Sequence, residues 1–216
     1  MARITVLGGT GYAGAAIAAE AAKRGHQVTA VSRTAPDSAI DGVDYATGSV
    51  LDAAVLDAVL PGRDVVISAL SPRGDMAGRV EDVLRELARR LTGTPTRLAH
   101  VGGAPSLLVE PGGPRLWDVT QEHVPAEVKP EIETGLTILA DLQATPETLD
   151  WFYVSPPEQF GSWVPAPATG AYRLGGDVLL RNEKGESVIS AADLAVAIVD
   201  EIEKPAHRRR RFTAAH

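Results

Sequence analysis

A glycine-rich turn near the beginning of the chain constrains the fold more than any other feature. Residues 4–14 read Ile-Thr-Val-Leu-Gly-Gly-Thr-Gly-Tyr-Ala-Gly, and an alanine-rich helical stretch follows as far as Arg24. Gly9, Gly11 and Gly14 have the G-x-G-x-x-G spacing. In that motif one glycine turns the chain sharply out of a strand, one lets the backbone approach a pyrophosphate, and one lets the helix pack close to the sheet. Because the first helical turn also attracts phosphate oxygens, the motif predicts dinucleotide binding.

Glycines also make ordinary turns, so the surroundings of the motif matter. Gly8, Gly11 and Gly14 fit the related G-x-x-G-x-x-G spacing, and a second strand-like run, residues 27–32, follows Gly25. A strand, a glycine turn, a helix and a second strand form the context in which this motif binds a cofactor. We therefore favour dinucleotide binding over a purely structural turn.

Composition indicates one α/β domain, residues 1–216, and argues against several functions. The net charge of −7 argues against direct nucleic-acid binding. There is no cysteine, and the five histidines have no metal-ligand spacing, so we expect no metal. No run of about eighteen apolar residues could span a membrane. The chain begins with an expected core strand, so we expect a soluble, cytoplasmic protein without a membrane partner; a homo-oligomer remains open.

Apolar periodicity predicts alternating strands and helices, with a smaller region on the substrate side at about residues 158–190. Since parallel strands need crossover connections, the pattern predicts an α/β fold with a Rossmann-type, doubly wound parallel sheet. Residues 172–174 and 178–181 are expected to form a hairpin, and Ser190 to cap the last helix. The other expected strands are residues 4–7, 27–32, 43–47, 64–70, 97–101, 149–155, 187–190 and 212–215, and the expected helices are residues 11–24, 51–60, 80–91, 131–142 and 191–203.

The only dense basic run is Arg208 to Arg211. We interpret it as a solvated or edge-strand segment, because charges on an edge strand discourage pairing between sheets. A patch that binds a partner is the alternative.

The residues after the second strand indicate which dinucleotide is bound. An acidic side chain that binds the ribose 2′-hydroxyl of NAD belongs about twenty residues beyond the glycines. This chain has Ser32, Arg33 and Thr34 there, and Asp37 comes too late to fill the role. An arginine at this point can pair with the 2′-phosphate of NADP. We therefore predict NADP(H) in preference to NAD(H); an exposed loop charge is the alternative interpretation of Arg33.

Small residues at three strand ends predict where the rest of the cofactor and a substrate would lie. They occupy residues 68–72, 102–104 and 155–157. Ligands of open α/β sheets bind outside the carboxyl ends of the strands, although each segment could also be a simple connection. Side chains in the less regular segments are further candidates for substrate contacts, with packing or solvation as the alternative: Trp117, Lys129, Phe160 and Trp163.

Five motifs cover nearly the whole chain: Gly8–Gly14, Asp64–Ser71, Val101–Ala104, Trp151–Pro156 and Ser190–Ala197. In this order they resemble the atypical short-chain dehydrogenase/reductase group, and in particular its NmrA-like and biliverdin-reductase-B-like NAD(P)H-binding members, which include proteins described as NADH-flavin reductases. The resemblance implies a Rossmann fold that holds NADP.

The resemblance and the strand ends together give a set of predicted site residues. Thr10–Ala13 would lie at the pyrophosphate, Ser32–Thr34 at the 2′-phosphate, and Ala69–Ser71 near the nicotinamide ribose. The predicted cofactor-binding residues are Gly8, Thr10, Gly11, Tyr12, Ala13, Gly14, Ser32, Arg33, Thr34, Ala69, Leu70, Ser71, Gly102 and Pro156, and the predicted substrate contacts are Gly103, Trp117, Lys129 and Phe160.

The chain lacks the Tyr-x-x-x-Lys pair of the classical dehydrogenases, so no catalytic residue is assigned. Reduction of a carbonyl gains a large rate factor from a positioned proton donor. Reduction of a flavin or quinone can take its proton from solvent, because the charge is delocalised. The four tyrosines (12, 45, 153 and 172) are followed four positions later by Ala16, Ser49, Pro157 and Gly176.

The sequence therefore predicts an NADPH-dependent oxidoreductase that passes hydride to a small flat acceptor such as a flavin or quinone. The alternative is a non-catalytic NADP(H)-binding redox sensor of the NmrA type. An isomerase or dehydratase that uses bound NADP is disfavoured, because the tyrosine pair is missing.

Overall fold

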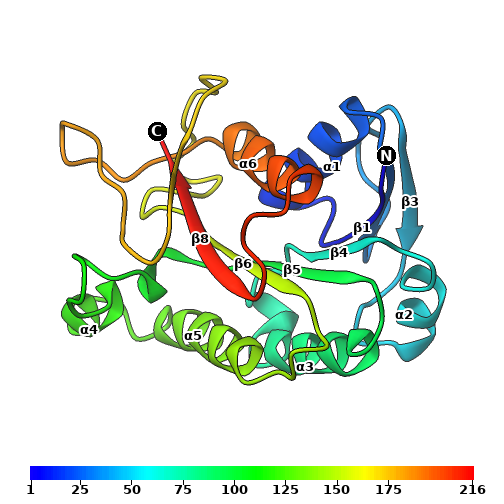
Figure 1. Ribbon diagram of the computed structural model, residues 1–216, viewed down its shortest axis with the longest axis horizontal. Coiled ribbons are helices and arrows are strands. Elements are labelled where there is room, and N and C mark those ends of the chain that lie inside the picture. Colours follow the sequence, from blue (N-terminus) through cyan, green and yellow to red (C-terminus); the bar gives the residue numbers. More distant parts are fainter.

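The structure, a computed structural model of residues 1–216, contains one eight-stranded sheet with helices on both faces (Figure 1). The strand order is β3-β2-β1-β4-β5-β6-β8-β7, and every neighbouring pair is parallel except β7 with β8. The first six positions have the order of the dinucleotide-binding fold, which confirms the predicted fold class. The strands are β1 (Arg3–Leu7), β2 (Gln27–Ser32), β3 (Val43–Thr47), β4 (Val65–Ser68), β5 (Arg97–Val101), β6 (Trp151–Ser155), β7 (Arg173–Gly175) and β8 (Arg210–Ala215).

Two helical layers cover the sheet. Helices α1 and α6 pack together on one face, and α2, α3 and α5 lie on the other (Figure 1). The helices are α1 (Tyr12–Lys23), α2 (Ala53–Val59), α3 (Val80–Leu91), α4 (Leu116–Thr120), α5 (Lys129–Gln143) and α6 (Ala191–Glu203), with short 3₁₀ turns at Gly74–Met76 and Ala104–Ser106. No helix has both the length and the hydropathy needed to cross a membrane.

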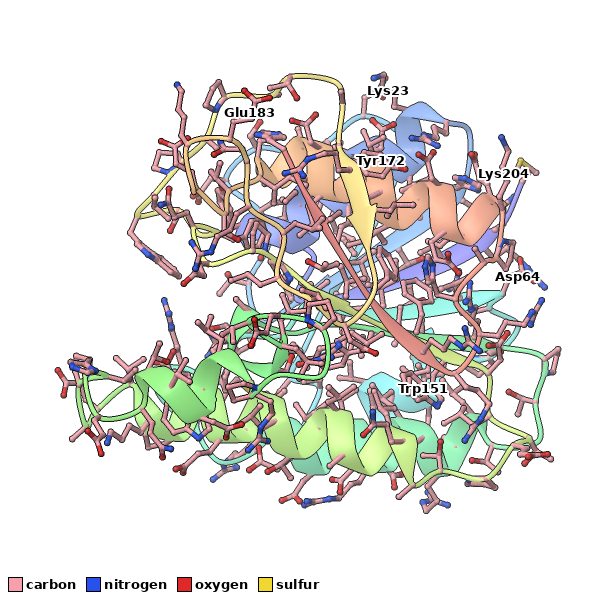
Figure 2. All side chains as sticks on the ribbon, turned by 60° about the vertical axis from the view of Figure 1, so that its left-hand side comes forward. Lys23, Asp64, Trp151, Tyr172, Glu183 and Lys204 are labelled. Carbon is pink, nitrogen blue, oxygen red and sulfur yellow. The ribbon has the colours of Figure 1, made fainter.

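Burial of the sheet on both faces explains the apolar composition of its central strands. All five residues of β6 are buried, and side chains fill the space between the sheet and each helical layer (Figure 2). Trp151 belongs to the core on the α3 and α5 side, whereas Lys23, Glu183 and Lys204 lie at the surface. A parallel sheet covered on both faces needs such continuous apolar strands.

The predicted hairpin near the C-terminus is wrong. Strand β7 pairs antiparallel with β8, with Arg173 opposite Ala215, and Val178 forms only an isolated bridge with Leu108. The backbone of β8 offers a long partner, so β7 pairs with it and not with the segment after the glycine turn. Residues 187–190 form no strand either, since Val188 makes only an isolated bridge with Gln159.

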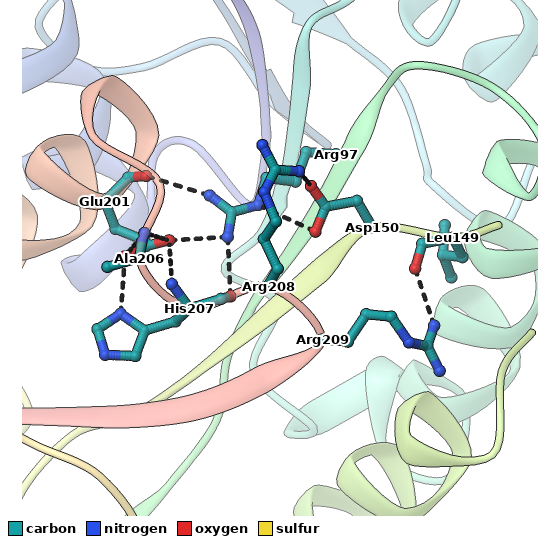
Figure 3. A network of polar contacts seen from close by, with 8 residues as sticks. All are labelled: Arg97, Leu149, Asp150, Glu201, Ala206, His207, Arg208 and Arg209. Carbon is teal, nitrogen blue, oxygen red and sulfur yellow. Dashed lines mark hydrogen bonds and ion pairs between the residues drawn. The ribbon is translucent and has the colours of Figure 1, made fainter. Parts of the chain in front are cut away.

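The arginine run lies at an open part of the sheet edge, as the solvated or edge-strand interpretation predicted, because β7 pairs only with residues 213–215 of β8. Arg208 pairs with Asp150, and Arg211 donates to Asp177 at 2.7 Å. Arg209 has a positive φ of 51°, and its guanidinium donates to backbone carbonyls that include that of Leu149, at 2.9 Å (Figure 3). Arg208, Arg209 and Arg211 therefore bind other segments of the same chain.

A buried ionic network fixes α6 to the amino end of β5 (Figure 3). Arg97 donates to the Glu201 carboxylate at 2.7 Å and to the His207 carbonyl at 2.8 Å. Burial opposes ionisation of Glu201, but its hydrogen bonds with His207 and Arg97 outweigh that effect and lower the pKa of its carboxyl. The network lies at the end of β5 opposite the candidate site, so we assign it a structural role.

Candidate functional site

The turn after β1 has a shape that requires glycine at two positions. Gly8 has φ of +80°, a backbone conformation that favours glycine, and its N–H donates to the Val31 carbonyl at 2.9 Å. A Cβ atom added to Gly14 would lie 2.2 Å from the Gly8 carbonyl oxygen. The first turn of α1 can therefore pack against the glycine turn only because residue 14 has no side chain.

The beginning of α1 offers unpaired hydrogen-bond donors. Gly11 is the N-cap residue, no side chain caps the helix, and its first turn contains no acidic residue. The N–H groups of Tyr12, Ala13 and Gly14 have no backbone or side-chain acceptor in the protein. Such a helix start favours an anion, both through its free donors and through the positive end of the helix dipole. The geometry therefore fits the pyrophosphate of a dinucleotide.

A cavity of about 580 Å³ opens beside this helix start, at the carboxyl ends of the central strands. Its walls come from the turn before α1, the segments that follow β4, β5 and β6, and one side of α5. The position is the crevice between β1 and β4, where the strand order reverses and open α/β sheets bind their ligands.

Most of the predicted contacts line this cavity, and the others lie in three places. Gly8 and Gly14 form the turn but do not line the cavity, and Thr10 is exposed. Ser32, Arg33 and Thr34 lie outside the cavity, at the end of β2. Two predicted substrate contacts also lie elsewhere: Trp117 is buried in α4, and Lys129 begins α5 without reaching the lining. The lining contains Gly11, Tyr12, Ala13, Ala69, Leu70, Ser71, Gly102, Gly103, Pro156 and Phe160.

Arg33 is paired in the structure. Its guanidinium donates to the carboxylate of Asp75, in the 3₁₀ turn after β4. The hydrogen bond from Arg33 holds the pKa of the Asp75 carboxyl below its usual value. Both side chains are more than half exposed, so a ligand can reach the guanidinium.

Aromatic side chains form the outer wall of the cavity. Tyr12 and Phe160 lie with their ring centroids 5.3 Å apart. The Arg73 guanidinium lies 4.5 Å from the ring centroid of Trp163 and donates to Glu131 at 2.7 Å. These contacts join α1, the segments after β4 and β6, and α5, so the wall is assembled from four separate parts of the chain.

Two buried polar rings in the cavity, those of His100 and Tyr153, had no predicted role. His100 and Tyr153 line the cavity although they are 3% and 0% exposed. Burial lowers the pKa of the His100 imidazole to about 4 and outweighs the opposing effect of the Ser68 backbone. Burial also raises the pKa of Tyr153 to about 12, so both rings are neutral at pH 7. A polar residue inside an otherwise apolar central strand is the signal that could have identified His100.

The fold, the glycine turn and the cavity together define a dinucleotide-binding protein of the Rossmann type. The family model described as NAD(P)H-binding matches residues 8–205, and the chain belongs to that family. The predicted membership of an NAD(P)H-binding family is thereby confirmed.

Known relatives cover the whole length of the chain. The uncharacterised protein YwnB of Bacillus subtilis is 36% identical over 214 residues, which are 98% of this chain and 97% of YwnB. A crystal structure from Streptococcus pneumoniae, of a protein described as a proposed NADH-flavin reductase, is 32% identical with a TM-score of 0.86 and full coverage of both chains. One from Burkholderia pseudomallei, of a proposed exported protein, is 37% identical with a TM-score of 0.84 and full coverage of both chains. The family and the first of these structures support a reductase.

Proposed function

We propose that this protein is an NADPH-dependent oxidoreductase that reduces a small, flat, conjugated acceptor such as a flavin or quinone. One observation carries the proposal: the unpaired N–H groups at the start of α1 open onto the same cavity as the aromatic wall. A phosphate site and a flat apolar pocket side by side suit a nicotinamide dinucleotide and a second planar molecule.

The cofactor would lie along the carboxyl edge of the sheet. The N–H groups of Tyr12 and Ala13 would bind the pyrophosphate, and the segment Ala69–Ser71 would contact the nicotinamide ribose. The nicotinamide, when bound, supplies a hydride. The protein supplies orientation in a pocket whose inner wall is buried.

The proposed preference for NADP(H) depends on Arg33. Its guanidinium lies at the end of β2, where the adenosine ribose binds in this fold. No carboxylate stands at that point of the chain to accept a hydrogen bond from the ribose 2′-hydroxyl of NAD. A 2′-phosphate would pair with this guanidinium through charge-assisted hydrogen bonds. NADH has no group that could make the same contact.

The cavity also suits an acceptor whose reduced form spreads its negative charge over a conjugated ring. The phenol of Tyr153 donates to the Gly135 carbonyl at 3.1 Å, and its raised pKa makes it a weak acid. No tyrosine–lysine pair is available to protonate an isolated alkoxide. The proposed NADH-flavin reductase of S. pneumoniae agrees with an acceptor of this flat class.

Steady-state oxidation of NADPH, followed by the loss of its absorbance, tests the proposal with FMN, FAD, riboflavin and a series of quinones as acceptors. We expect saturable oxidation with at least one acceptor and a higher kcat/KM with NADPH than with NADH. Tight binding of NADPH and NADP without turnover of any acceptor would contradict the reductase and favour the redox sensor.

A further inference from the structure

A row of three polar side chains crosses the centre of the sheet at the cavity. Ser68 on β4 is in register with His100 on β5, and His100 is in register with Tyr153 on β6. All three are at least 97% buried, whereas the residues two positions earlier on the same face, Val66, Leu98 and Trp151, are apolar and belong to the core. Polar groups in such central strands lose hydration, so each needs a hydrogen-bond partner.

Ser68 and Tyr153 each form a hydrogen bond within the protein, whereas His100 uses only one of its two ring nitrogens. Tyr153 donates to the Gly135 carbonyl at 3.1 Å. The Nδ1 atom of His100 lies 3.1 Å from the Ser68 hydroxyl oxygen. The other ring nitrogen of His100, Nε2, has no hydrogen-bond partner, although the side chain lines the cavity. Because Nε2 is not fully buried, a ligand group in the cavity can reach it and form a hydrogen bond there.

The imidazole is also held in a fixed orientation. Its ring centroid lies 5.4 Å from that of Tyr153 at an interplanar angle of 53°, on the side away from Ser68. Gly102 and Gly103 follow the same strand, and a Cβ atom on Gly102 would lie 1.8 Å from the Tyr153 hydroxyl. The two glycines therefore leave the backbone that follows β5 without side chains, next to the strand ends where the nicotinamide would lie.

We propose that His100 Nε2–H donates a hydrogen bond to a ring carbonyl oxygen of the acceptor, which makes a flat conjugated carbonyl compound the substrate class of this cavity. The inference rests on the proposed function. In the tautomer that it requires, the Ser68 hydroxyl donates to Nδ1 and Nε2 carries the hydrogen. Quinones and the isoalloxazine ring of flavins both present such an oxygen at the edge of a planar ring.

The contact would strengthen during reduction. Hydride adds to the conjugated ring with its two electrons, and the displaced electron pair moves onto the carbonyl oxygen, which becomes negatively charged. The dinucleotide is oxidised, and a proton from water then completes the reduced product. His100 keeps its own proton throughout, and a hydrogen bond to an anionic oxygen is stronger than one to a neutral carbonyl.

Two substitutions separate this role from a purely structural one. The amide nitrogen of H100Q can take the place of Nε2, whereas that of H100N can take only the place of Nδ1 and so keeps the Ser68 contact. H123Q, at an exposed histidine outside the cavity, is the matched control. We would titrate each protein with menadione and with riboflavin, following the quenching of tryptophan fluorescence, and would measure kcat and KM in parallel with thermal melting.

We expect H100N to bind menadione roughly three- to ten-fold more weakly than wild type, the loss expected for one hydrogen bond, and H100Q to retain most of the affinity. H123Q should match wild type. In wild-type protein the NMR signal of one imidazole N–H proton should also move downfield when menadione is added, a readout that needs neither turnover nor a variant.

The assignment of Nε2 would be overturned if both variants lost the same affinity for menadione, if H100Q lost more than H100N, or if H100N lost none. It would also be overturned if wild type bound neither menadione nor riboflavin. If wild type reduces quinones and the variants behave like it, the inference fails while the proposed function stands. If wild type binds menadione through this contact but oxidises no NADPH, the proposed function fails and the carbonyl-binding site stands.

Discussion

Arg33 at the end of β2 and Asp75 in the turn after β4 form an ion pair across the carboxyl end of β1. The pair joins the two sides of the crevice in which the adenosine half of a dinucleotide lies in this fold. The guanidinium that we assign to the 2′-phosphate therefore already has a carboxylate partner, which a phosphate must displace or share.

This arrangement predicts opposite effects for the two partners. R33A should weaken NADPH binding by about ten-fold, since a charge-assisted contact is lost, and should leave NADH binding nearly unchanged. D75N should strengthen NADPH binding by only about two- to five-fold, because the ion pair is exposed and contributes little. Calorimetric titration with both cofactors measures each value. R210A, at an exposed arginine of β8, is the control; equal losses of NADPH and NADH affinity in R33A would contradict the assignment.

G14A should damage the glycine turn. Because the added Cβ atom would lie 2.2 Å from the Gly8 carbonyl oxygen, α1 must move away from the turn. We expect a loss of about 1–3 kcal/mol in the free energy of unfolding and much weaker binding of either cofactor. Urea denaturation and calorimetric titration measure the two effects. G176A, where nothing lies within 4 Å of the added atom, should change neither; normal cofactor binding by G14A would show that the turn is not the phosphate site.

Arg73 and Trp163 should be energetically coupled. The guanidinium lies 4.5 Å from the centroid of the indole ring, and Trp163 is 66% exposed, so the contact resembles an exposed cation–π pair. A double-mutant cycle of R73A and W163A should give a coupling of about 0.5–1 kcal/mol in the free energy of unfolding. W163A should also raise the KM for the acceptor more than it lowers kcat. Strict additivity of the two substitutions would show that the contact contributes nothing.

Asp193 should make stability depend on pH in the acid range. Burial disfavours its charge, but hydrogen bonds from Thr169, Ser190, His216 and Gly170 outweigh that effect and lower its pKa from 3.8 to about 2. The folded chain therefore binds a proton less readily than the unfolded chain. The stabilisation, on the order of 2 kcal/mol, is complete above pH 4 and is lost as pH falls towards 2.

The substitution D193N separates the contribution of Asp193 to this pH dependence from that of the other carboxyl groups. Urea denaturation at pH 6 should show the variant to be less stable than wild type, and the difference should shrink as the pH falls from 4 to 2. A difference that is independent of pH would mean that the carboxylate charge of Asp193 does not contribute.

The sequence predicted those elements whose local pattern agrees with their final environment. The apolar spacing of residues 80–91 gave α3 with its observed limits, and Ser190 caps α6 through its side chain, 2.9 Å from the N–H of Asp193. The glycine spacing located the start of α1, because the steric reason for each glycine is local. The pairing of β7 was predicted wrongly, since it depends on β8, nearly 40 residues away along the chain.

The candidate site was predictable in part for the same reason. Gly11 to Ala13 and Ala69 to Ser71 line the cavity, because the carboxyl ends of parallel strands meet at one edge of the sheet. The pairing of Arg33 with Asp75, and the row formed by Ser68, His100 and Tyr153, depend on strand order and register. Neither can be read from local spacing. Trp117 was a poor candidate in retrospect, because the side chain is buried in α4 and does not reach the cavity.

The proposed function depends on hydride transfer from NADPH to a flat acceptor bound in this cavity. The most direct measurement is anaerobic incubation of purified protein with NADPH and menadione, with both the NADPH consumed and the hydroquinone formed being quantified. We expect saturable, enzyme-dependent conversion in equimolar amounts, with a lower rate in R33A at limiting NADPH. Tight NADPH binding without conversion of menadione, riboflavin or FMN would contradict the proposed function.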